Sequence, residues 1–522
     1  MIFIIPLVLA IAGVALILTR RRYLALREKQ PAQVIVKGDT YSESVDKTYN
    51  ASLSRPKIEI VRQCCIIGAG RAAATTGIAL ASRNPEVQFC VVDTDERVIN
   101  AWNSDTLPVF EPGLEEIFFD DQCINARSER GQGGSTDQIV FNNCERRRKL
   151  SNLIFSTNIH AAVSAAELIF LCIEMDSTGP IGTDPFAYLD TTLQAIAHAS
   201  RGHKIIVQRT TAPYGVTAYI KKQLTCLSSP TAIFTTLVNP LFSLPGSLVH
   251  DTLNPDRIVI GHIYTPDSSG SCIAALKGVY TSFVPDERVV TMDAWSVELG
   301  RIGSMALLAQ RGISASSLVS ISRDTEAGVG RVGWIVGCDV LKGGSGRGGL
   351  SPWLRAEIRC LVYLARGRGM DVAGYWEGVL RMEEEGWRRD VGRLLSMFGG
   401  GIAKRKVAII CGMEGQEMEK VGVVLRELGE AGMGASVWSG DGEKKAEDVL
   451  RALKCDRDEI AVAGSLEDAC SGCDAVIVCG MIMVRDEIWQ RIANQMEAPK
   501  VLLDMTMGMD RMQMQQLGFE MV

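Results

Sequence analysis

Two glycines, a small residue and an aspartate stand at spacings suited to holding a phosphorylated cofactor. Gly68, Gly70 and Ala73 satisfy the pattern G-x-G-x-x-G/A in the segment CCIIGAGRAAATTGIAL. In this pattern the first glycine permits a tight turn, the second lets the backbone approach a pyrophosphate, and the third small residue lets a helix pack on a strand. Asp93 follows Ala73 by about twenty residues, where a carboxylate can accept hydrogen bonds from a ribose diol. The pattern predicts a dinucleotide site that prefers NAD to NADP, with a purely structural turn as the alternative.

These four residues require a strand that ends at Gly68, a helix that begins after Gly70 and a second strand that ends at Asp93. The apolar runs VRQCCIIGAG and VQFCVVD predict the strands, and ATTGIALASR predicts the helix. Strand and helix patterns then continue to alternate, with further strands at NLIFST, LIFLCIE, HKIIVQ, TAIFTTLV and DRIVIGH. Such alternation is typical of a doubly wound parallel sheet. We therefore expect an α/β fold that begins with a Rossmann-like dinucleotide-binding domain.

The pattern changes to long helices from Trp295, and strands return at KRKVAIICG. This predicts a helical central domain and a second, C-terminal Rossmann-like α/β domain. The polar residues 120–149 are interpreted as a surface insertion in the first domain, although their basic run ERRRK leaves contact with an anionic surface as an alternative. The predicted boundaries are an anchor at 1–22, a linker at 23–57, the dinucleotide-binding domain at 58–265, the central domain at 266–398 and the C-terminal domain at 399–522.

The N-terminus has the pattern of a membrane anchor. The stretch from Ile2 to Leu18 is apolar apart from Pro6 and Gly13, and three arginines follow it directly. Its length is at the lower limit for a helix that crosses a bilayer. A cleaved signal peptide would carry basic residues before the apolar run and a small-x-small site after it, and neither is present. A signal peptide and a wrongly assigned start stay as alternatives. The arginines place the folded domains of a single-pass membrane protein in the cytosol.

The composition argues against several functions. The net charge is −6, from 55 basic and 61 acidic residues, so the overall charge does not favour nucleic acid. The 15 cysteines have no regular spacing and several lie in apolar runs, which is typical of buried thiols in a reducing compartment. Cys470 and Cys473 form an isolated C-x-x-C, and the five histidines are scattered. We therefore expect no metal site.

The segment from Asp93 to Leu114 resembles the UDP-glucose 6-dehydrogenases of the UDP-glucose/GDP-mannose dehydrogenase family, whose members follow the ribose acid with an INAWNS and an EPGL motif. This chain reads INAWNSDTLPVFEPGL. The resemblance implies NAD as cofactor, a UDP-sugar as a possible substrate, and a homodimer or higher oligomer formed through the central helices. It also places Arg97 and Thr211 in the cofactor site. Further matches in family order are FSTNI from Phe155, RTTAP at Arg209–Pro213, NPLF at Asn239–Phe242, NPDRI from Asn254, WSVEL at Trp295–Leu299, LAQR at Leu308–Arg311, LVYLA at Leu361–Ala365 and YW at Tyr375–Trp376.

Members of that family oxidise the C6 alcohol of the sugar to a carboxylate with two NAD⁺ in turn, and a cysteine captures the intermediate aldehyde. Aligned on the family's motifs, Ser351 stands at the cysteine, Arg301 at a lysine and Glu357 near an aspartate. Leu241 stands at a glutamate, and Met305 at an asparagine. A serine nucleophile needs an adjacent base, and an arginine does not lose its proton. The alignment thus implies that the activity is lost or strongly reduced.

Other family positions differ as well. An error of gene structure between Gly328 and Gly415 would explain the departures within that span, but not those at Leu241, Arg301 and Met305. The further departures are IEMDS at Ile173–Ser177, an arginine displaced by one residue to Arg97, the region near Leu341, a shortened loop at Gly343–Gly349, CGMEGQEMEK at Cys411–Lys420 and DMTM at Asp504–Met507.

Three functions stay open at this point. The chain is a nucleotide-sugar dehydrogenase at the cytosolic face of a membrane, or a silent NAD-binding homologue that forms a hetero-oligomer with an active relative and regulates it. The third is a membrane-tethered scaffold. Cys360 offers no substitute nucleophile, because it lies in a predicted helix between apolar residues and is best interpreted as a core thiol. The residues therefore argue against turnover.

Overall fold

The computed structural model describes residues 60–119, 150–173, 186–209, 211–243, 246–263, 269–323, 325, 327–336, 352–399, 405–411, 418–439, 460–480, 486–496, 499–505, 509 and 511–522. The predicted anchor and linker, the insertion at 120–149 and Ser351 lie outside the described residues. The chain divides into two compact units, Met1–Arg55 and Pro56–Val522, and every described residue belongs to the second. Within these ranges, no helix has the length and apolar character needed to cross a membrane.

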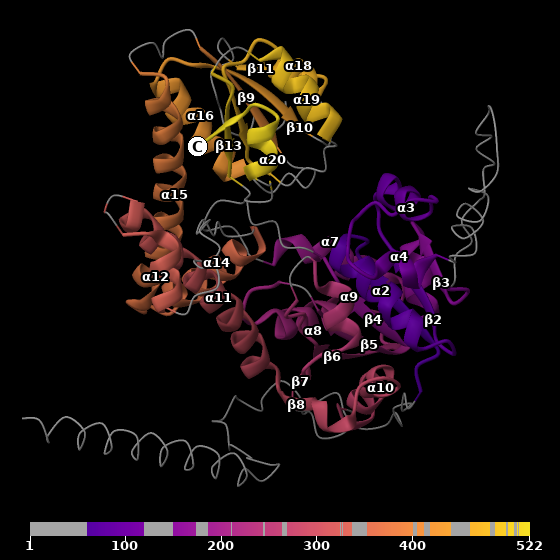
Figure 1. The fold of residues 1–522 in the computed structure, drawn as a ribbon. Helices are drawn as coiled ribbons and strands as arrows, with labels where there is room; N and C mark the ends of the chain where they lie inside the picture. Colours follow the sequence, from indigo (N-terminus) through magenta and orange to yellow (C-terminus); the bar gives the residue numbers. More distant parts are fainter. Residues whose placement is uncertain are drawn as a thin grey trace, which may run out of the picture. The chain divides into compact units, whose positions relative to one another are not determined.

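An eight-stranded sheet carries the glycine turn (Figure 1). The strand order is β3-β2-β1-β4-β5-β6-β7-β8, so the sequence runs outward from β1 in one direction and then from β4 in the other. Sheets of this kind bind ligands beyond the carboxyl ends of the strands at the point where the order reverses. The predicted α/β fold is confirmed. The strands are β1 (Gln63–Ile67), β2 (Gln88–Val92), β3 (Leu153–Ser156), β4 (Leu168–Leu171), β5 (Gly202–Gln208), β6 (Ala232–Val238), β7 (Ile258–His262) and β8 (Val289–Asp293).

The expectation of a wholly parallel sheet is wrong at its far edge. β7 pairs with β6 in the antiparallel direction, with Val238 opposite Gly261. The chain returns from β6 through one short helix, α9 (Leu248–Leu253), and enters β7 from the same end at which it left β6. A Cβ at Gly261 would lie 2.5 Å from Cγ1 of Val238, so this close pairing needs glycine. β8 then pairs with β7, and the sheet continues to Asp293, past the boundary predicted at residue 265.

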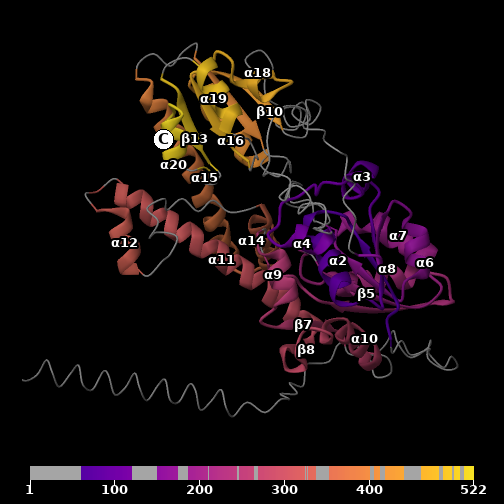
Figure 2. The same cartoon turned by 45° about the vertical axis from the view of Figure 1, so that its right-hand side comes forward.

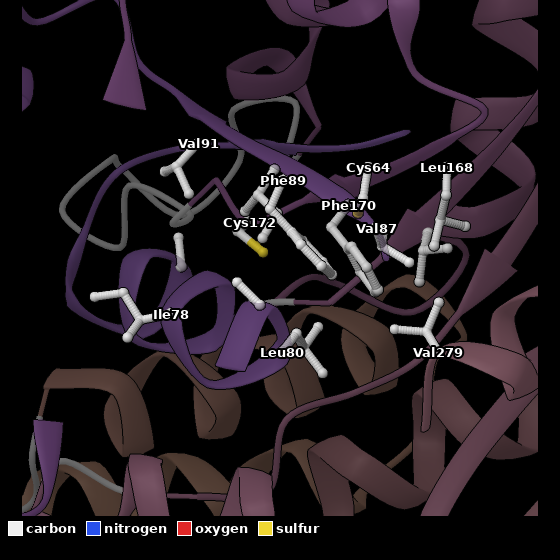
Figure 3. Close-up of a cluster of buried hydrophobic side chains, with 14 of the residues drawn as sticks. Cys64, Ile78, Leu80, Val87, Phe89, Val91, Leu168, Phe170, Cys172 and Val279 are labelled. Carbon is white, nitrogen blue, oxygen red and sulfur yellow. The ribbon is translucent and has the colours of Figure 1, made fainter. Parts of the chain in front are cut away.

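Apolar side chains cover both faces of this sheet. Cys64 and Ile66 of β1 point to one face, and Cys65 and Ile67 point to the other, as expected from the two-residue repeat of a strand. Figure 3 shows the first face, where Phe89 of β2 belongs to the buried cluster. The first face is covered by α2 (Arg71–Arg83), α3 (Glu96–Trp102), α4 (Leu114–Phe118) and α10 (Ser269–Thr281), and the second by α6 (Ile159–Ala165), α7 (Asp190–Ala199) and α8 (Val216–Leu227), which Figure 2 shows side by side.

Long helices and a second sheet follow. The second sheet is parallel throughout, with the order β11-β10-β9-β12-β13-β14, and this is the strand order of a Rossmann fold. The central helices are α11 (Ala294–Arg323), α12 (Val329–Val336), α14 (Pro352–Gly367) and α15 (Val372–Met397). The remaining elements are the short 3₁₀ helices η1 (Ala187–Leu189) and η2 (Asp286–Arg288), the strands β9 (Lys406–Cys411), β10 (Gly434–Ser439), β11 (Ile460–Val462), β12 (Ala475–Val478), β13 (Val501–Asp504) and β14 (Glu520–Met521), and the helices α16 (Met418–Glu430), α18 (Leu466–Cys470), α19 (Asp486–Gln495) and α20 (Arg511–Gln516).

Candidate functional site

The turn after β1 has the backbone geometry that a dinucleotide requires. Gly68 has φ +102°, and a Cβ there would lie 2.5 Å from the carbonyl oxygen of Cys172. Its N–H donates to the carbonyl oxygen of Val92 at 2.8 Å. Position 68 therefore accepts only glycine without displacing backbone, because both its conformation and its surroundings exclude a side chain. The turn brings the ends of β1, β2 and β4 together at the switch point of the sheet.

The Asp93 carboxylate is fixed beside this turn. Oδ2 accepts a hydrogen bond from the N–H of Ala69 at 2.8 Å, and Oδ1 accepts one from the N–H of Asp95 at 3.0 Å. The side chain is half-buried. A carboxylate has about four acceptor positions, so two stay available for the hydroxyls of a ribose. The turn is fixed from the other side by Trp102 of the INAWNS motif, whose Nε1 donates to the carbonyl oxygen of Ala69 at 2.8 Å.

Helix α2 presents its N-terminus to the same place. Gly70 is the N-cap and supplies no side-chain cap, and the first turn contains no acidic residue. The N–H groups of its first turn and the helix dipole favour a phosphate there. Ala73 is buried, as the pattern predicts. The helix also packs closely on the sheet one turn later, at Gly77, where a Cβ would lie 2.8 Å from Cγ2 of Val91. The sequence pattern contains no signal for Gly77.

These features fit the adenosine and pyrophosphate parts of NAD. Gly68 gives the backbone approach, the α2 N-terminus gives the phosphate donors, and Asp93 gives the ribose acceptor. Arg97, which the resemblance places in the cofactor site, lies in the first turn of α3. Its side chain is 91% exposed and binds Asp95, with Nε 3.2 Å from Oδ1 and an Nη2 2.9 Å from Oδ2. Asp95, which the sequence reading did not single out, is also the N-cap of α3.

A second group of site positions meets around the guanidinium of Arg301 on α11. Nη1 pairs with Oε1 of Glu357 on α14, and Nη2 donates to Oγ1 of Thr211 at 2.9 Å. Nε lies 3.4 Å from the carbonyl oxygen of Leu241. The structure thus brings together two of the three candidate catalytic positions and one candidate cofactor position. Ser351, the third catalytic position, lies outside the described residues.

The Arg301–Glu357 ion pair is largely shielded from solvent. The side chain of Arg301 is 11% exposed and that of Glu357 is 1% exposed. Oε2 of Glu357 is buried and has no hydrogen-bond partner among the described residues. Met305, one turn after Arg301, packs in a cluster of apolar residues and offers no polar donor. The guanidinium is therefore held by the protein's own carboxylate and hydroxyl, and the carboxylate of Glu357 is paired with it through Oε1.

Cys360 does not replace the missing nucleophile. It is buried on α14, and burial raises the pKa of its thiol to about 12, against a smaller opposing effect of Arg301. Reactive cysteines have lowered pKa values because the thiolate is the nucleophile. The interpretation of Cys360 as a core thiol is consistent with both observations.

Buried polar residues from the matched motifs form hydrogen bonds between the loops that follow β5 and β6. Arg209 donates from Nη1 to Oδ1 of Asn239 at 2.6 Å and to the hydroxyl of Tyr280 at 3.0 Å. Asn239 in turn donates to the carbonyl oxygen of Val259 at 2.9 Å. Burial raises the pKa of Tyr280, which favours its role as a neutral donor to Asn239. This network fixes the ends of β5 and β6 against α10. Its residues therefore hold the loops that follow these two strands in place.

Two glutamates from other motifs have similar linking roles. Glu298 of WSVEL accepts from the N–H groups of Gly215 and Thr217 at 2.7 and 2.9 Å, and so caps the N-terminus of α8 from α11. Desolvation raises the pKa of Glu298 in spite of these bonds. Glu111 of EPGL accepts from the N–H of Gly246 at 2.9 Å with each carboxylate oxygen. Glu298 and Glu111 thus link segments that are far apart in the sequence.

The C-x-x-C of the second sheet has a structural environment. Cys470 and Cys473 are buried, at the C-terminal end of α18, and Cys473 contacts the carbonyl oxygen of Ala469 at 3.2 Å. Burial raises their pKa values to about 12 and about 11. Redox-active pairs instead have lowered pKa values. Across the described ranges, no group of three or more histidines, cysteines or acids could hold a metal ion. The sequence departures at Glu174–Ser177, Leu341, Gly343–Gly349 and Gly412–Gln416 lie outside those ranges.

Known proteins similar to this chain agree with this reading of the first sheet. Residues 62–132 and 134–284 match the NAD binding domain of the UDP-glucose/GDP-mannose dehydrogenase family. UDP-glucose 6-dehydrogenase of Pongo abelii is 28% identical over 493 residues, which cover 88% of this chain and 92% of the relative. UDP-glucose 6-dehydrogenase 2 of Arabidopsis thaliana is 32% identical over 362 residues, which cover 67% of this chain and 69% of the relative.

Solved structures show the same fold. A UDP-glucose dehydrogenase from the archaeon Pyrobaculum islandicum superposes with a TM-score of 0.61 at 18% identity, covering 89% of this chain and 99% of the other. A UDP-D-ManNAc dehydrogenase from Pyrococcus horikoshii gives 0.56 at 15% identity, covering 88% and 98%. The sequence identity, the NAD-binding region and the fold lead to one conclusion: the chain belongs to the UDP-glucose/GDP-mannose dehydrogenase family, and its cofactor is NAD.

Proposed function

We propose that this protein binds NAD and performs the family's oxidation of the C6 alcohol of a UDP-sugar at a strongly reduced rate or not at all. The observation that carries the proposal is the buried Arg301–Glu357 pair, in which the cation at the position of the family's lysine is neutralised by the protein itself. An arginine keeps its proton at any physiological pH and cannot serve as a base.

The neighbouring positions support the same proposal. Leu241 contributes only its backbone carbonyl to Arg301 and has no carboxylate to move a proton. Met305 is buried among apolar residues and cannot donate to an oxyanion. Removal of one acid–base group lowers a rate by about 10²–10⁴-fold, and groups that act together do not add. A serine at position 351 would need an adjacent base, and neither Leu241 nor Met305 supplies one.

A role in assembly is the second part of the proposal. Trp334 and Ile335 of α12 are 75% and 76% exposed, and Leu307 and Ile321 of α11 are also exposed. Apolar side chains of this size favour contact with another protein surface. We propose a homodimer or higher oligomer through the central helices, or a hetero-oligomer in which this chain regulates an active homologue.

The membrane-tethered scaffold is the remaining alternative. Residues 1–22, with their apolar stretch from Ile2 to Leu18, are proposed as a single-pass anchor, with the folded part in the cytosol. The described cysteines are all free thiols, which agrees with a reducing compartment. A scaffold would need the fold and the exposed helices but neither NAD nor a UDP-sugar.

Detergent-solubilised full-length protein tests these alternatives. Thermal unfolding is measured with NAD⁺ and with UDP-glucose separately, and NADH formation is followed with both present, beside an active family member. We expect stabilisation by NAD⁺, which at 100 times Kd amounts to about 2.7 kcal/mol, and no steady NADH formation. Steady NADH formation at a rate comparable to that of the active family member, abolished by Ser351→Ala, would contradict the proposal. If neither ligand changes the thermal unfolding, the membrane-tethered scaffold is the function that remains.

A further inference from the structure

Asp95 occupies a position from which it can control the sugar end of the cofactor site. Its N–H donates at 3.0 Å to Oδ1 of Asp93, the carboxylate that stands ready for the ribose. Its own carboxylate takes three contacts from Arg97, one with the backbone N–H at 2.9 Å and two with the guanidinium at 3.2 and 2.9 Å. Asp93, Asp95 and Arg97 are thus linked by successive hydrogen bonds at the end of β2.

We propose that Asp95 is a positioning residue for cofactor choice: it holds the guanidinium of Arg97 away from the ribose 2′ position and so strengthens the rejection of NADP. NAD and NADP differ only by a phosphate on that hydroxyl. Proteins that accept NADP place an arginine near the 2′-phosphate, whereas NAD proteins place an acid on the 2′ hydroxyl. This chain has an acid, Asp93, and an arginine, Arg97, only four residues apart. The pairing of Arg97 with Asp95 decides which of the two contacts the ribose 2′ position.

The charges at the site favour this reading. Asp93 and Asp95 each carry a negative charge, and Arg97 neutralises one of them. A 2′-phosphate would enter a site that is negative overall, and it would meet no uncommitted cation at Arg97, whose guanidinium already binds Asp95. A charge-assisted hydrogen bond from a released arginine to phosphate is among the stronger polar contacts, and release also removes one repulsive charge.

The competing interpretation is that Asp95 serves only as the N-cap of α3. Asparagine is as good an N-cap as aspartate, so Asp95→Asn keeps the cap and removes the charge that holds Arg97. If Asp95 acted only through the helix, this variant would leave the affinities for NAD⁺ and NADP⁺ in an unchanged ratio. The ratio therefore separates positioning from a structural role.

The experiment measures the Kd of NAD⁺ and of NADP⁺ by calorimetric titration of the full-length protein and three variants. For Asp95→Asn we expect the ratio Kd(NADP⁺)/Kd(NAD⁺) to fall by about tenfold, since one good contact of this kind corresponds to about that factor. Arg97→Gln alone should change the ratio by less than about twofold, and the double variant should return to within about twofold of the wild-type ratio. Higher salt should shrink the effect of Asp95→Asn, because the groups are exposed.

Three results would overturn the inference. The first is an unchanged ratio in Asp95→Asn, and the second is a shift in Arg97→Gln alone as large as that in Asp95→Asn. The third is a double variant that keeps the reduced ratio, which would assign the effect to the lost charge without the arginine. Wild-type protein that binds no NAD⁺ would refute the binding part of the proposed function as well, whereas NAD⁺ binding with an unchanged ratio would refute this inference alone.

Discussion

Replacement of Arg301 with methionine is expected to lower the free energy of unfolding by about 3–5 kcal/mol, because it leaves the carboxylate of Glu357 buried without a partner. The Glu357 side chain is 1% exposed, and its Oε2 already has no hydrogen-bond partner among the described residues. Methionine is long and unbranched, so the aliphatic part of the arginine is kept and the change removes mainly the charge.

The matched double variant Arg301→Met/Glu357→Leu removes both charges. Replacement of a buried ion pair by apolar residues of similar volume is often neutral or stabilising by about 1–4 kcal/mol. We therefore expect the double variant to be more stable than Arg301→Met. The surroundings suit it, since Met305, Ile358 and Val362 form an apolar cluster beside the pair.

Arg301→Lys restores the residue type of the family and separates charge from shape. Lysine would keep the pair with Glu357 but could not also hold Oγ1 of Thr211 and the carbonyl oxygen of Leu241 in one plane. We expect a loss of about 1–3 kcal/mol, smaller than that of Arg301→Met. No NADH formation is expected from this variant, because Leu241 still supplies no carboxylate.

Urea denaturation followed by tryptophan fluorescence measures these differences, with hydrogen exchange of α11 and α14 amides to assign the transition, since a chain of this size can unfold in steps. Thr211→Val serves as the control, because it removes one hydrogen bond without stranding a charge. A loss in Arg301→Met of less than about 1 kcal/mol, or no recovery in the double variant, would refute the reasoning that Glu357 is buried and charged.

Three further predictions follow from single residues. Gly68→Ala should abolish NAD⁺ binding in a titration and lower the melting temperature, because its Cβ would lie 2.5 Å from the carbonyl oxygen of Cys172; unchanged binding would contradict the turn geometry. Glu298→Ala should lower the free energy of unfolding by about 1–2 kcal/mol, since α8 loses its cap, and exchange of the Thr217 amide should accelerate. Cys360 keeps its proton in the folded state to about pH 12 against 9.0 for an ordinary thiol, so it favours folding below pH 9.0 and this contribution is lost as pH rises from 9.0 toward 12. Cys360→Val should therefore flatten the alkaline decline in denaturation midpoint, and an unaltered decline would show that Cys360 does not titrate there.

The sequence predicts the first half of the fold well because its information is local. Runs such as QCCII and QFCVV are buried on both faces, and they appear as β1 and β2. The sequence does not predict the β7–β8 edge of the sheet, because the direction of an edge strand depends on the path of the chain between strands. β8 carries the mixed sequence VVTMD, exposed along most of its length, so no apolar run marks it. The antiparallel direction of β7 has no local signal either.

The sequence by itself determined the family and the adenosine half of the NAD site. Gly68, Gly70 and Asp93 lie within one strand–helix–strand unit, where spacing alone fixes their relative positions. Only the tertiary structure decided that Arg301 binds Glu357 and Thr211, which are 56 and 90 residues away in the sequence. An ion pair forms where folding brings two charged groups together and excludes water from them, and neither the approach nor the burial is encoded in the residues next to them.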